Sequence, residues 1–201
     1  MEYSKKVGIM GGTFNPIHLG HLILAEAARE HFELDEILFI PSGVPYMKEN
    51  VLDSKTRVSM TGLAIEDNPF FALSTMVVDR GGNSYSYETI ATLKEKNPMT
   101  KYYFIAGADS LFSMEKWMHP ELIFKNCTVV VAVRRGHSTD ELEEQISLLK
   151  EKYKTDIFIL PTRTVDISST AIRDRIHDGR SIRYMVHDKV GQYITKNNLY
   201  L

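Results

Sequence analysis

Short apolar runs alternate along this chain with longer segments of helical period, and this alternation limits its fold more than any other feature. Runs of strand length occur at residues 7–10, 37–40, 102–106, 129–133 and 157–160. Apolar residues recur at helical spacing in the segments 19–31, 54–67, 87–96, 111–116, 139–152, 170–177 and 188–196. Strands that alternate with helices build βαβ units with parallel strands. The sequence therefore predicts an α/β fold with an open, parallel, Rossmann-like sheet and helices on both faces.

The breaks between these segments bear on domain organisation. Residues 70–78 are expected to form one extended segment, because polar and apolar side chains partly alternate there. Residues 41–45, with two prolines and a glycine, end the second strand, and residues 80–83, with two glycines, break the chain before the next helix. Neither break is long enough to be an interdomain linker, and 201 residues can bury one substantial core. We therefore expect a single domain over residues 1–201.

Composition limits the partners of the chain. Its 24 Lys and Arg against 26 Asp and Glu give a formal net charge of −2, so no basic field predicts nucleic-acid binding. No stretch approaches the length of a membrane span, and the residues before the first strand do not resemble a secretory signal. The only cysteine, Cys127, lies in an apolar run where a buried structural thiol is favoured over a nucleophile. These features predict a cytoplasmic protein that binds neither nucleic acid nor membranes.

The strongest functional signal is the segment Gly11–His21, which reads Gly-Gly-Thr-Phe-Asn-Pro-Ile-His-Leu-Gly-His and joins the first strand to the first helix. Its paired glycines allow a tight turn and a close approach of phosphate to the backbone at a helix N-terminus. The spacing fits neither the Rossmann dinucleotide fingerprint nor a Walker A loop. His18 and His21 are expected on one helix face at the mouth of the loop. The alternative is a connecting turn with two histidines that only cap or decorate a helix.

A second polar segment lies near the C-terminus, where Asp166–Arg173 reads Asp-Ile-Ser-Ser-Thr-Ala-Ile-Arg. Three consecutive hydroxyl residues are good N-caps, so an ordinary helix start is one interpretation. The same hydroxyls, beside backbone N–H groups and followed by Arg173, also predict an anion site.

These motifs carry a resemblance to a known family. The segment Gly11–His21 resembles the (H/T)xGH signature of nucleotidyltransferases, which act at the α-phosphate of ATP or CTP. Ser84–Thr89, Gly107–Ser110 with Trp117, and Ile167–Arg173 resemble segments of bacterial nicotinate-nucleotide adenylyltransferases in the same order. The resemblance spans essentially the whole chain and implies a fold of nucleotidyltransferase type. It also implies that nicotinate mononucleotide is joined to the AMP moiety of ATP, giving nicotinate adenine dinucleotide and pyrophosphate in NAD biosynthesis.

The resemblance further implies which residues form the site. The expected catalytic residues are His18, His21 and Arg173, and His21 matches the histidine that contacts the α-phosphate. Together with these three, the residues expected to contact ATP are Gly11, Gly12, Thr13, Phe14, Gly107, Asp109, Ile167, Ser168 and Ser169. The residues expected to contact nicotinate mononucleotide are Thr13, Lys48, Tyr85, Ser86 and Trp117. Mg²⁺ is expected to arrive with ATP, because no carboxylate cluster predicts a metal site built by the protein.

Some positions depart from the family pattern or have simpler interpretations. The family usually has Asp, Thr and Pro where this chain has Asn15, Ser86 and His187. Asparagine keeps an acceptor but loses a charge, so no charged role is expected at position 15. For Lys48 a solvated loop position, and for Trp117 a place in the core, are the competing interpretations.

Two other functions remain as alternatives. Phosphopantetheine adenylyltransferases and cytidylyltransferases share the first motif but lack the Gly107–Ser110 segment with Trp117. A non-catalytic nucleotide sensor could use the same fold, because fold does not fix activity, although both histidines and Arg173 speak against it. A homo-oligomer is compatible with the sequence and is not predicted by it.

Overall fold

The fold is taken from a computed structural model that describes residues 4–44, 50–132, 139–162 and 165–201. Its contacts divide the chain into two compact units, each built from three separate stretches. The first unit contains residues 1–11, 24–38 and 85–164, and the second contains residues 12–23, 39–84 and 165–201. The single-domain prediction is not tested by this division and stays a prediction.

The described strands form one six-stranded sheet in the order β3-β2-β1-β4-β5-β6. Their bounds are β1 Lys5–Gly12, β2 Glu36–Pro41, β3 Phe71–Leu73, β4 Thr100–Gly107, β5 Thr128–Ala132 and β6 Ile157–Leu160. The sheet is parallel, and its register places Ile9 of β1 beside Phe104 of β4 and Val130 of β5 beside Phe158 of β6. The predicted α/β class with a parallel sheet is therefore confirmed.

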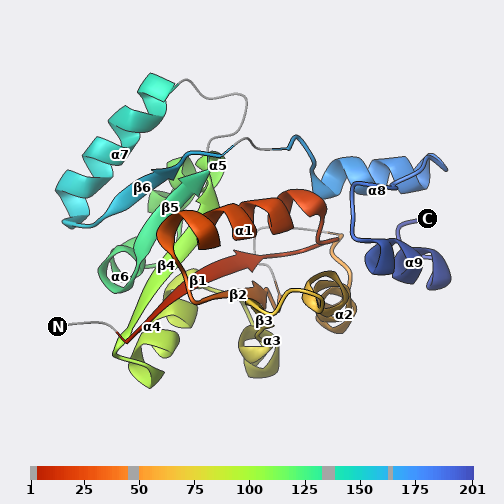
Figure 1. The fold of residues 1–201 in the computed structure, drawn as a ribbon, viewed down its shortest axis with the longest axis horizontal. Helices are drawn as coiled ribbons and strands as arrows, with labels where there is room; N and C mark the ends of the chain where they lie inside the picture. The colour runs from red at the N-terminus through yellow and green to blue at the C-terminus, as the bar shows by residue number, and fades with distance from the viewer. Residues whose placement is uncertain (1–3, 45–49, 133–138, 163–164) are drawn as a thin grey trace. The chain divides into compact units, whose positions relative to one another are not determined.

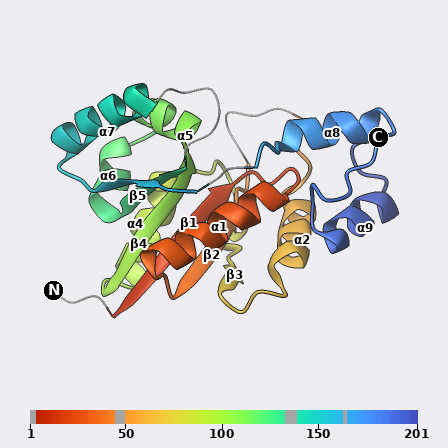
Figure 2. The ribbon, with the colours of Figure 1, turned by 45° about the horizontal axis from the view of Figure 1, so that its top comes forward.

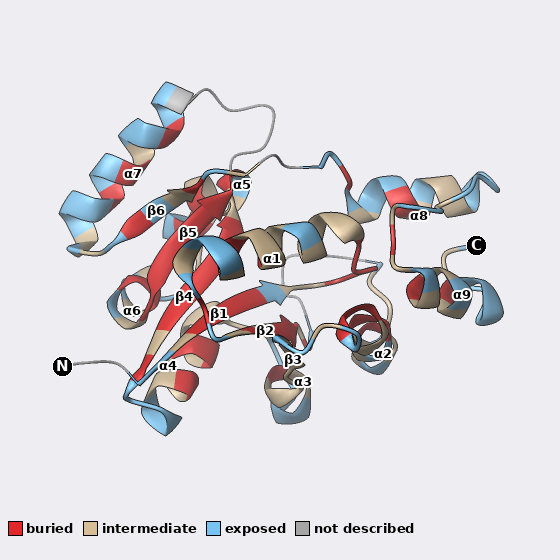
Figure 3. Ribbon diagram, in the orientation of Figure 1, coloured by how far each residue is buried: buried red, intermediate tan, exposed pale blue. Residues whose placement is uncertain are grey.

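The first unit surrounds its strands with helices on both faces. These are the second half of α1 (Leu19–Phe32), then α4 (Ser86–Lys96), α5 (Ala108–Ser113), the 3₁₀ turn η1 (Met114–Lys116), α6 (Pro120–Asn126) and α7 (Thr139–Tyr153). In both ribbon views α1 passes in front of the sheet and α4 lies behind it (Figures 1 and 2). All five residues of β5 are buried, and the strands at the centre of this unit are red in Figure 3. The core of the unit is therefore the sheet and the helix faces against it.

Two residues of the first unit illustrate how closely this core is packed. A Cβ added to Gly8 of β1 would lie 2.5 Å from Cδ1 of Ile37, so a larger residue at this strand position would require the Ile37 side chain to move. The Cys127 thiol is buried, and burial raises its pKa to about 12. Such a thiol is a structural group, in agreement with the prediction for Cys127.

The second unit carries the ends of β1 and β2, the strand β3 and the helices α2 (Ser54–Ile65), α3 (Met76–Arg80), α8 (Ser169–His177) and α9 (Asp188–Lys196). Helices α2 and α9 lie side by side (Figure 1). Lys189 of α9 forms ion pairs with Glu66 at 2.5 Å and with Asp67 at 3.0 Å, both just after α2. These ion pairs link α9 to the C-terminal end of α2.

The prediction of one extended segment over 70–78 is wrong beyond Leu73, because a short helix, α3, begins at Met76. Local polar bonds favour this helix over a longer strand. The Ser74 hydroxyl accepts a bond from the backbone N of Met76 at 3.4 Å, and Thr75 Oγ1 donates to Asp79 Oδ2 at 2.7 Å. Bonds of this kind compete with a strand ladder. Helix α6, with Pro120 in its first turn, was also not predicted.

Over the described residues, no helix is long and apolar enough to cross a membrane.

Candidate functional site

The first motif forms a tight loop between β1 and α1. Strand β1 ends at Gly12, where an added Cβ would lie 2.8 Å from the Phe14 ring. Phe14 is buried and has a φ of 50°, a left-handed conformation that is unusual for a bulky residue. The next peptide bond, Asn15–Pro16, is cis. The chain then enters α1 at Leu19, whose backbone N donates to the carbonyl of Met185 at 2.9 Å. Because the sequence predicts that it holds phosphate, this loop (residues 12–18) is called the phosphate loop below.

The two histidines of the motif are stacked on each other. Their ring centroids are 3.7 Å apart with planes at 26°, and His18 is buried while His21 is half-buried. The backbone N of His18 donates to Nδ1 of His21 at 3.3 Å. Because Nδ1 acts as an acceptor, the neutral His21 ring carries its proton on Nε2. The structure thus gives His21 a defined tautomer with an Nε2–H donor. His18 precedes the helix rather than lying on its face.

The C-terminal motif contacts the phosphate loop directly. Ser169 Oγ donates to the carbonyl of Pro16 at 2.8 Å, and Arg173 Nη1 donates to the carbonyl of Asn15 at 2.9 Å. A second Arg173 nitrogen, Nη2, donates to Thr170 Oγ1 at 3.2 Å. Two segments that lie about 150 residues apart in the chain therefore meet at one place. The structure brings together nine of the predicted residues in the second unit, namely Gly12, Thr13, Phe14, His18, His21, Ile167, Ser168, Ser169 and Arg173.

Ser168 has the structural role that the sequence offered as an alternative. It is the N-cap of α8, and its hydroxyl accepts a bond from the backbone N of Ala171 at 3.1 Å. A hydroxyl that accepts from the helix still has its own proton to donate. The capping bond is therefore compatible with the predicted anion contact.

Asn15 uses both halves of its amide. Its Oδ1 accepts from the Tyr200 hydroxyl at 2.8 Å and from the backbone N of Leu52 at 3.4 Å, while Nδ2 donates to the carbonyl of Asn50 at 3.5 Å. Burial raises the pKa of Tyr200, so its phenol stays protonated and donates. A carboxylate at position 15 would keep the acceptors and lose the donor to Asn50. Asparagine therefore supplies a donor at this position that aspartate would lack.

Sequence reasoning missed Arg57 and Tyr200. Arg57, in the second turn of α2, is almost completely buried and bonds to the carbonyls of Thr13, Gly43 and Leu52. An arginine three residues after the helix start ordinarily lies in solvent, so the pattern held no signal for its burial. Tyr200 is the second-to-last residue of the sequence, and contacts are ordinarily few at such positions.

The remaining predicted residues lie in the first unit, apart from Lys48, which falls outside the described residues. Gly107 is the N-cap of α5 at the end of β4, and Asp109 is exposed in the first turn of that helix. The exposed Gly11 is the last residue of this unit's share of β1. These positions are at carboxyl ends of parallel strands, where open α/β sheets bind ligands.

Trp117 and the start of α4 are also in the first unit. The half-buried Trp117 ring stands edge-on to Phe104, with 6.3 Å between centroids. Tyr85 is the N-cap of α4, and Ser86 is its first residue. Tyr87, in the first turn of α4, contacts the His119 ring at 4.8 Å, and His119 is two residues after Trp117. The predicted mononucleotide residues of this unit therefore come from neighbouring segments.

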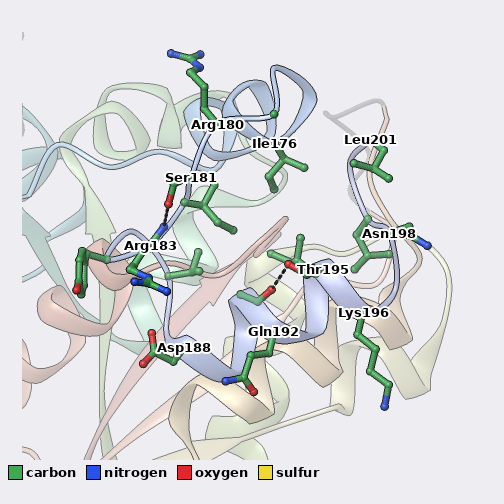
Figure 4. A pocket seen from close by; sticks show the side chains of 17 residues that line it. Ile176, Arg180, Ser181, Arg183, Asp188, Gln192, Thr195, Lys196, Asn198 and Leu201 are labelled. Atoms are coloured by element: carbon green, nitrogen blue, oxygen red, sulfur yellow. Dashed lines mark hydrogen bonds between the residues drawn. The ribbon is translucent and has the colours of Figure 1, made fainter.

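Among the residues with described side chains, no group of three or more His, Cys, Asp or Glu residues could hold a metal ion. A separate hollow of about 930 Å³ lies among the end of α8, α9 and the C-terminal tail (Figure 4). None of the predicted site residues lines this hollow.

The fold and the loop together define a nucleotide-binding α/β protein of the nucleotidyltransferase type, with two histidines and an arginine gathered at the loop after the first strand. The sequence matches the cytidylyltransferase-like family over residues 9–175. It is 45% identical to a protein of Lachnoclostridium phytofermentans named a probable nicotinate-nucleotide adenylyltransferase, over 98% of this chain and 100% of that protein. A protein of the same name from Thermoanaerobacter sp. is 40% identical, over 100% of this chain and 96% of that protein. The chain therefore belongs to the nicotinate-nucleotide adenylyltransferase group of the cytidylyltransferase-like family.

A solved structure agrees with this at the level of fold. The Plasmodium falciparum nicotinic acid mononucleotide adenylyltransferase complexed with NaAD matches with a TM-score of 0.79 over 98% of this chain and 97% of that one. Its sequence identity is 19%, so this likeness shows the fold alone.

Proposed function

We propose that this enzyme transfers the AMP moiety of ATP to nicotinate mononucleotide, releasing pyrophosphate and giving nicotinate adenine dinucleotide. The observation that carries the proposal is the meeting of Ser169 and Arg173 with the phosphate loop, beside the stacked His18 and His21. The names of its full-length relatives support the same substrates. The buried thiol of Cys127 is compatible with a reducing compartment, and we propose that the enzyme works in the cytoplasm.

The reaction needs no general base. The attacking group is the 5′-phosphate of the mononucleotide, whose second pKa of about 6 leaves it largely dianionic at neutral pH. Catalysis then consists of placing two charged partners in line and stabilising the charge that builds on the α-phosphate. His21 is suited to this task because its Nδ1 is held as an acceptor and its Nε2 carries the donor proton. We assign to Nε2–H the bond to the α-phosphate.

The β- and γ-phosphates are assigned to His18, Ser168, Ser169 and Arg173, with Ser169 contributing its backbone N–H because its hydroxyl proton is donated to the Pro16 carbonyl. Arg173 makes its bond to Asn15 through Nη1 and its bond to Thr170 through Nη2, and a guanidinium has five N–H donors in all. The remaining ATP contacts are proposed at Gly11, Gly12, Thr13, Phe14, Gly107, Asp109 and Ile167. Mg²⁺ is proposed to come bound to the triphosphate, where it neutralises charge, and no step is assigned to it.

Nicotinate mononucleotide is assigned to Thr13, Lys48, Tyr85, Ser86 and Trp117. The half-buried Trp117 ring is suited to stack on the pyridine ring. The N-terminus of α4 at Ser86 offers backbone N–H groups to the carboxylate of nicotinate.

Pyrophosphate release tests the proposal. The protein is mixed with Mg²⁺ and either ATP or CTP, and with one of three acceptors, namely nicotinate mononucleotide, phosphopantetheine or phosphocholine. We expect pyrophosphate release only with ATP and nicotinate mononucleotide. Release only with phosphopantetheine identifies the first rival, and release with CTP and phosphocholine identifies a cytidylyltransferase. If the protein binds ATP but releases no pyrophosphate with any of the acceptors, the result supports a nucleotide sensor and contradicts the proposal.

A further inference from the structure

Arg57 combines a charge with nearly complete burial. Arg57 is 1% exposed. Burial lowers the pKa of its guanidinium, although arginine stays protonated in proteins. Its donors end on neutral oxygens: Nε on the Leu52 carbonyl at 2.9 Å, Nη1 on the Thr13 carbonyl at 2.7 Å, and Nη2 on the Gly43 carbonyl at 2.6 Å. A buried charge is an expensive way to stabilise a core, since an apolar side chain often does as well. This cost points to a role beyond packing.

The three carbonyls belong to three segments of the second unit. Thr13 follows β1, Gly43 follows β2, and Leu52 precedes α2. Nη1 also donates to Ser42 Oγ at 3.3 Å. One planar guanidinium therefore fixes the phosphate loop to the segments that surround it, which the point charge of a lysine could not do with the same geometry.

The bond to Thr13 matters because of the residue that follows. Phe14 has the left-handed φ of 50°, which is unfavourable for an aromatic side chain and persists only where the surroundings hold it. Arg57 holds the carbonyl on its N-terminal side, and Arg173 holds the Asn15 carbonyl on its C-terminal side. A peptide group is planar, so a Thr13 carbonyl turned toward Arg57 turns the Phe14 N–H the opposite way.

The Phe14 ring in turn contacts His21. The two rings are edge-on, with centroids 5.1 Å apart and planes at 88°, and Phe14 is 2% exposed. The position of Phe14 thus limits where the His21 ring can lie. A continuous path of contacts runs from Arg57 through the Thr13 carbonyl and the Phe14 ring to His21.

We propose that Arg57 is a positioning residue for the transfer reaction, which holds Phe14 in its left-handed conformation and so sets the place of the His21 ring. The predicted effect on rate rests on the proposed function. The predicted effect on the His21 ring does not, because it is present without substrate.

The test compares Arg57→Lys with Met60→Ala. Met60 is on the same helix and is 0% exposed, and it makes no bond to the phosphate loop in the described contacts, so its truncation destabilises the same element by another route. For Arg57→Lys, kcat should fall by about tenfold or more while the KM for ATP changes by less than about threefold. Met60→Ala should keep kcat within about twofold of wild type at a temperature where both variants are folded.

A second measurement uses no substrate. The imidazole resonances of His21 are followed by NMR and assigned from the spectrum of His21→Ala. They should move in Arg57→Lys, because the Phe14 ring shifts, and should stay in place in Met60→Ala. If Arg57→Lys does not fold, Phe14→Leu carries the test, since it breaks the same path one step later. Because Phe14 is also a proposed ATP contact, the KM for ATP and the His21 resonances are measured together with kcat.

The possible results separate the two proposals. Unchanged His21 resonances and unchanged kcat in Arg57→Lys overturn the positioning role, as does an equal loss of kcat in Met60→Ala. A normal kcat in Phe14→Leu overturns it in the case where Arg57→Lys is unfolded. If the wild type releases no pyrophosphate, the proposed function fails, and the NMR comparison alone decides the role of Arg57.

Discussion

At the scale of single residues, one backbone bond decides which nitrogen of His21 carries a proton. The N–H of His18 points at Nδ1, and the stacked His18 ring and the perpendicular Phe14 ring limit the position of the imidazole. The sequence could predict that the two histidines lie close together, because they are three residues apart at a helix start. It could not predict the stacking or the tautomer, since these depend on where the chain turns before Leu19.

We expect His21→Ala to lower kcat by about 10²–10³, the usual cost of removing one donor to a developing charge. The half-buried ring contacts Phe14 and His18, so a small fall in thermal stability should accompany the change. Pyrophosphate release and a melting curve on the same sample separate the two effects. A turnover near that of wild type would remove His21 from the mechanism.

At the scale of elements, the sequence predicted the helix starts better than their contacts. The hydroxyl run before residue 170 predicted the start of α8, and Ser168 caps it as expected. Its docking on the Asn15 and Pro16 carbonyls could be proposed only from resemblance, because no periodicity links residues so far apart. Helix α3 was mistaken for a strand because its Ser, Thr and Asp bonds override a weak alternation.

Arg173→Ala should weaken ATP binding more than mononucleotide binding, because α8 is assigned to the triphosphate. A lost bond between charged groups corresponds to roughly 10-fold to 100-fold in affinity for ATP. Titration calorimetry with each substrate measures the difference. The control is Arg175→Ala on the same helix, whose Nε donates to the Ser181 carbonyl away from the phosphate loop. Equal losses for both substrates would make Arg173 a structural residue.

Helix α4 should make the enzyme prefer nicotinate mononucleotide over its amide analogue. The helix begins at Ser86, and its N-cap, Tyr85, makes no side-chain capping bond. Backbone N–H donors and the positive end of the helix favour a carboxylate, whereas the NH₂ of a carboxamide would face other donors. We expect a preference of roughly 10²-fold in kcat/KM, as at other sites where a mismatch leaves polar groups unpaired. Competition of the two mononucleotides in one assay measures it, and a ratio near one contradicts this role of α4.

At the scale of the whole molecule, the chain passes repeatedly between the two compact units. The boundaries at residues 11, 23 and 38 fall inside β1, α1 and β2, so each of these elements contributes residues to both units. If half of a strand or helix unfolds, the backbone N–H and C=O groups at the break lose their hydrogen-bond partners. Continuous elements shared in this way favour cooperative unfolding over independent unfolding, which is what the prediction of one domain requires.

We therefore expect the two units to unfold in urea with one midpoint. In the first unit Cys127 reports unfolding, because its pKa of about 12 leaves only about one thiol in 10⁴ ionised at pH 8, against roughly a quarter for an exposed thiol. Hydrogen exchange in peptides from α2 reports the second unit. Met60→Ala and Ile123→Ala each leave a cavity at a fully buried site, one in each unit. Each variant should lower, by the same amount, the midpoint that Cys127 reports and the midpoint that hydrogen exchange in α2 reports. If either variant lowers the midpoint of its own unit alone, the chain has two domains that unfold independently.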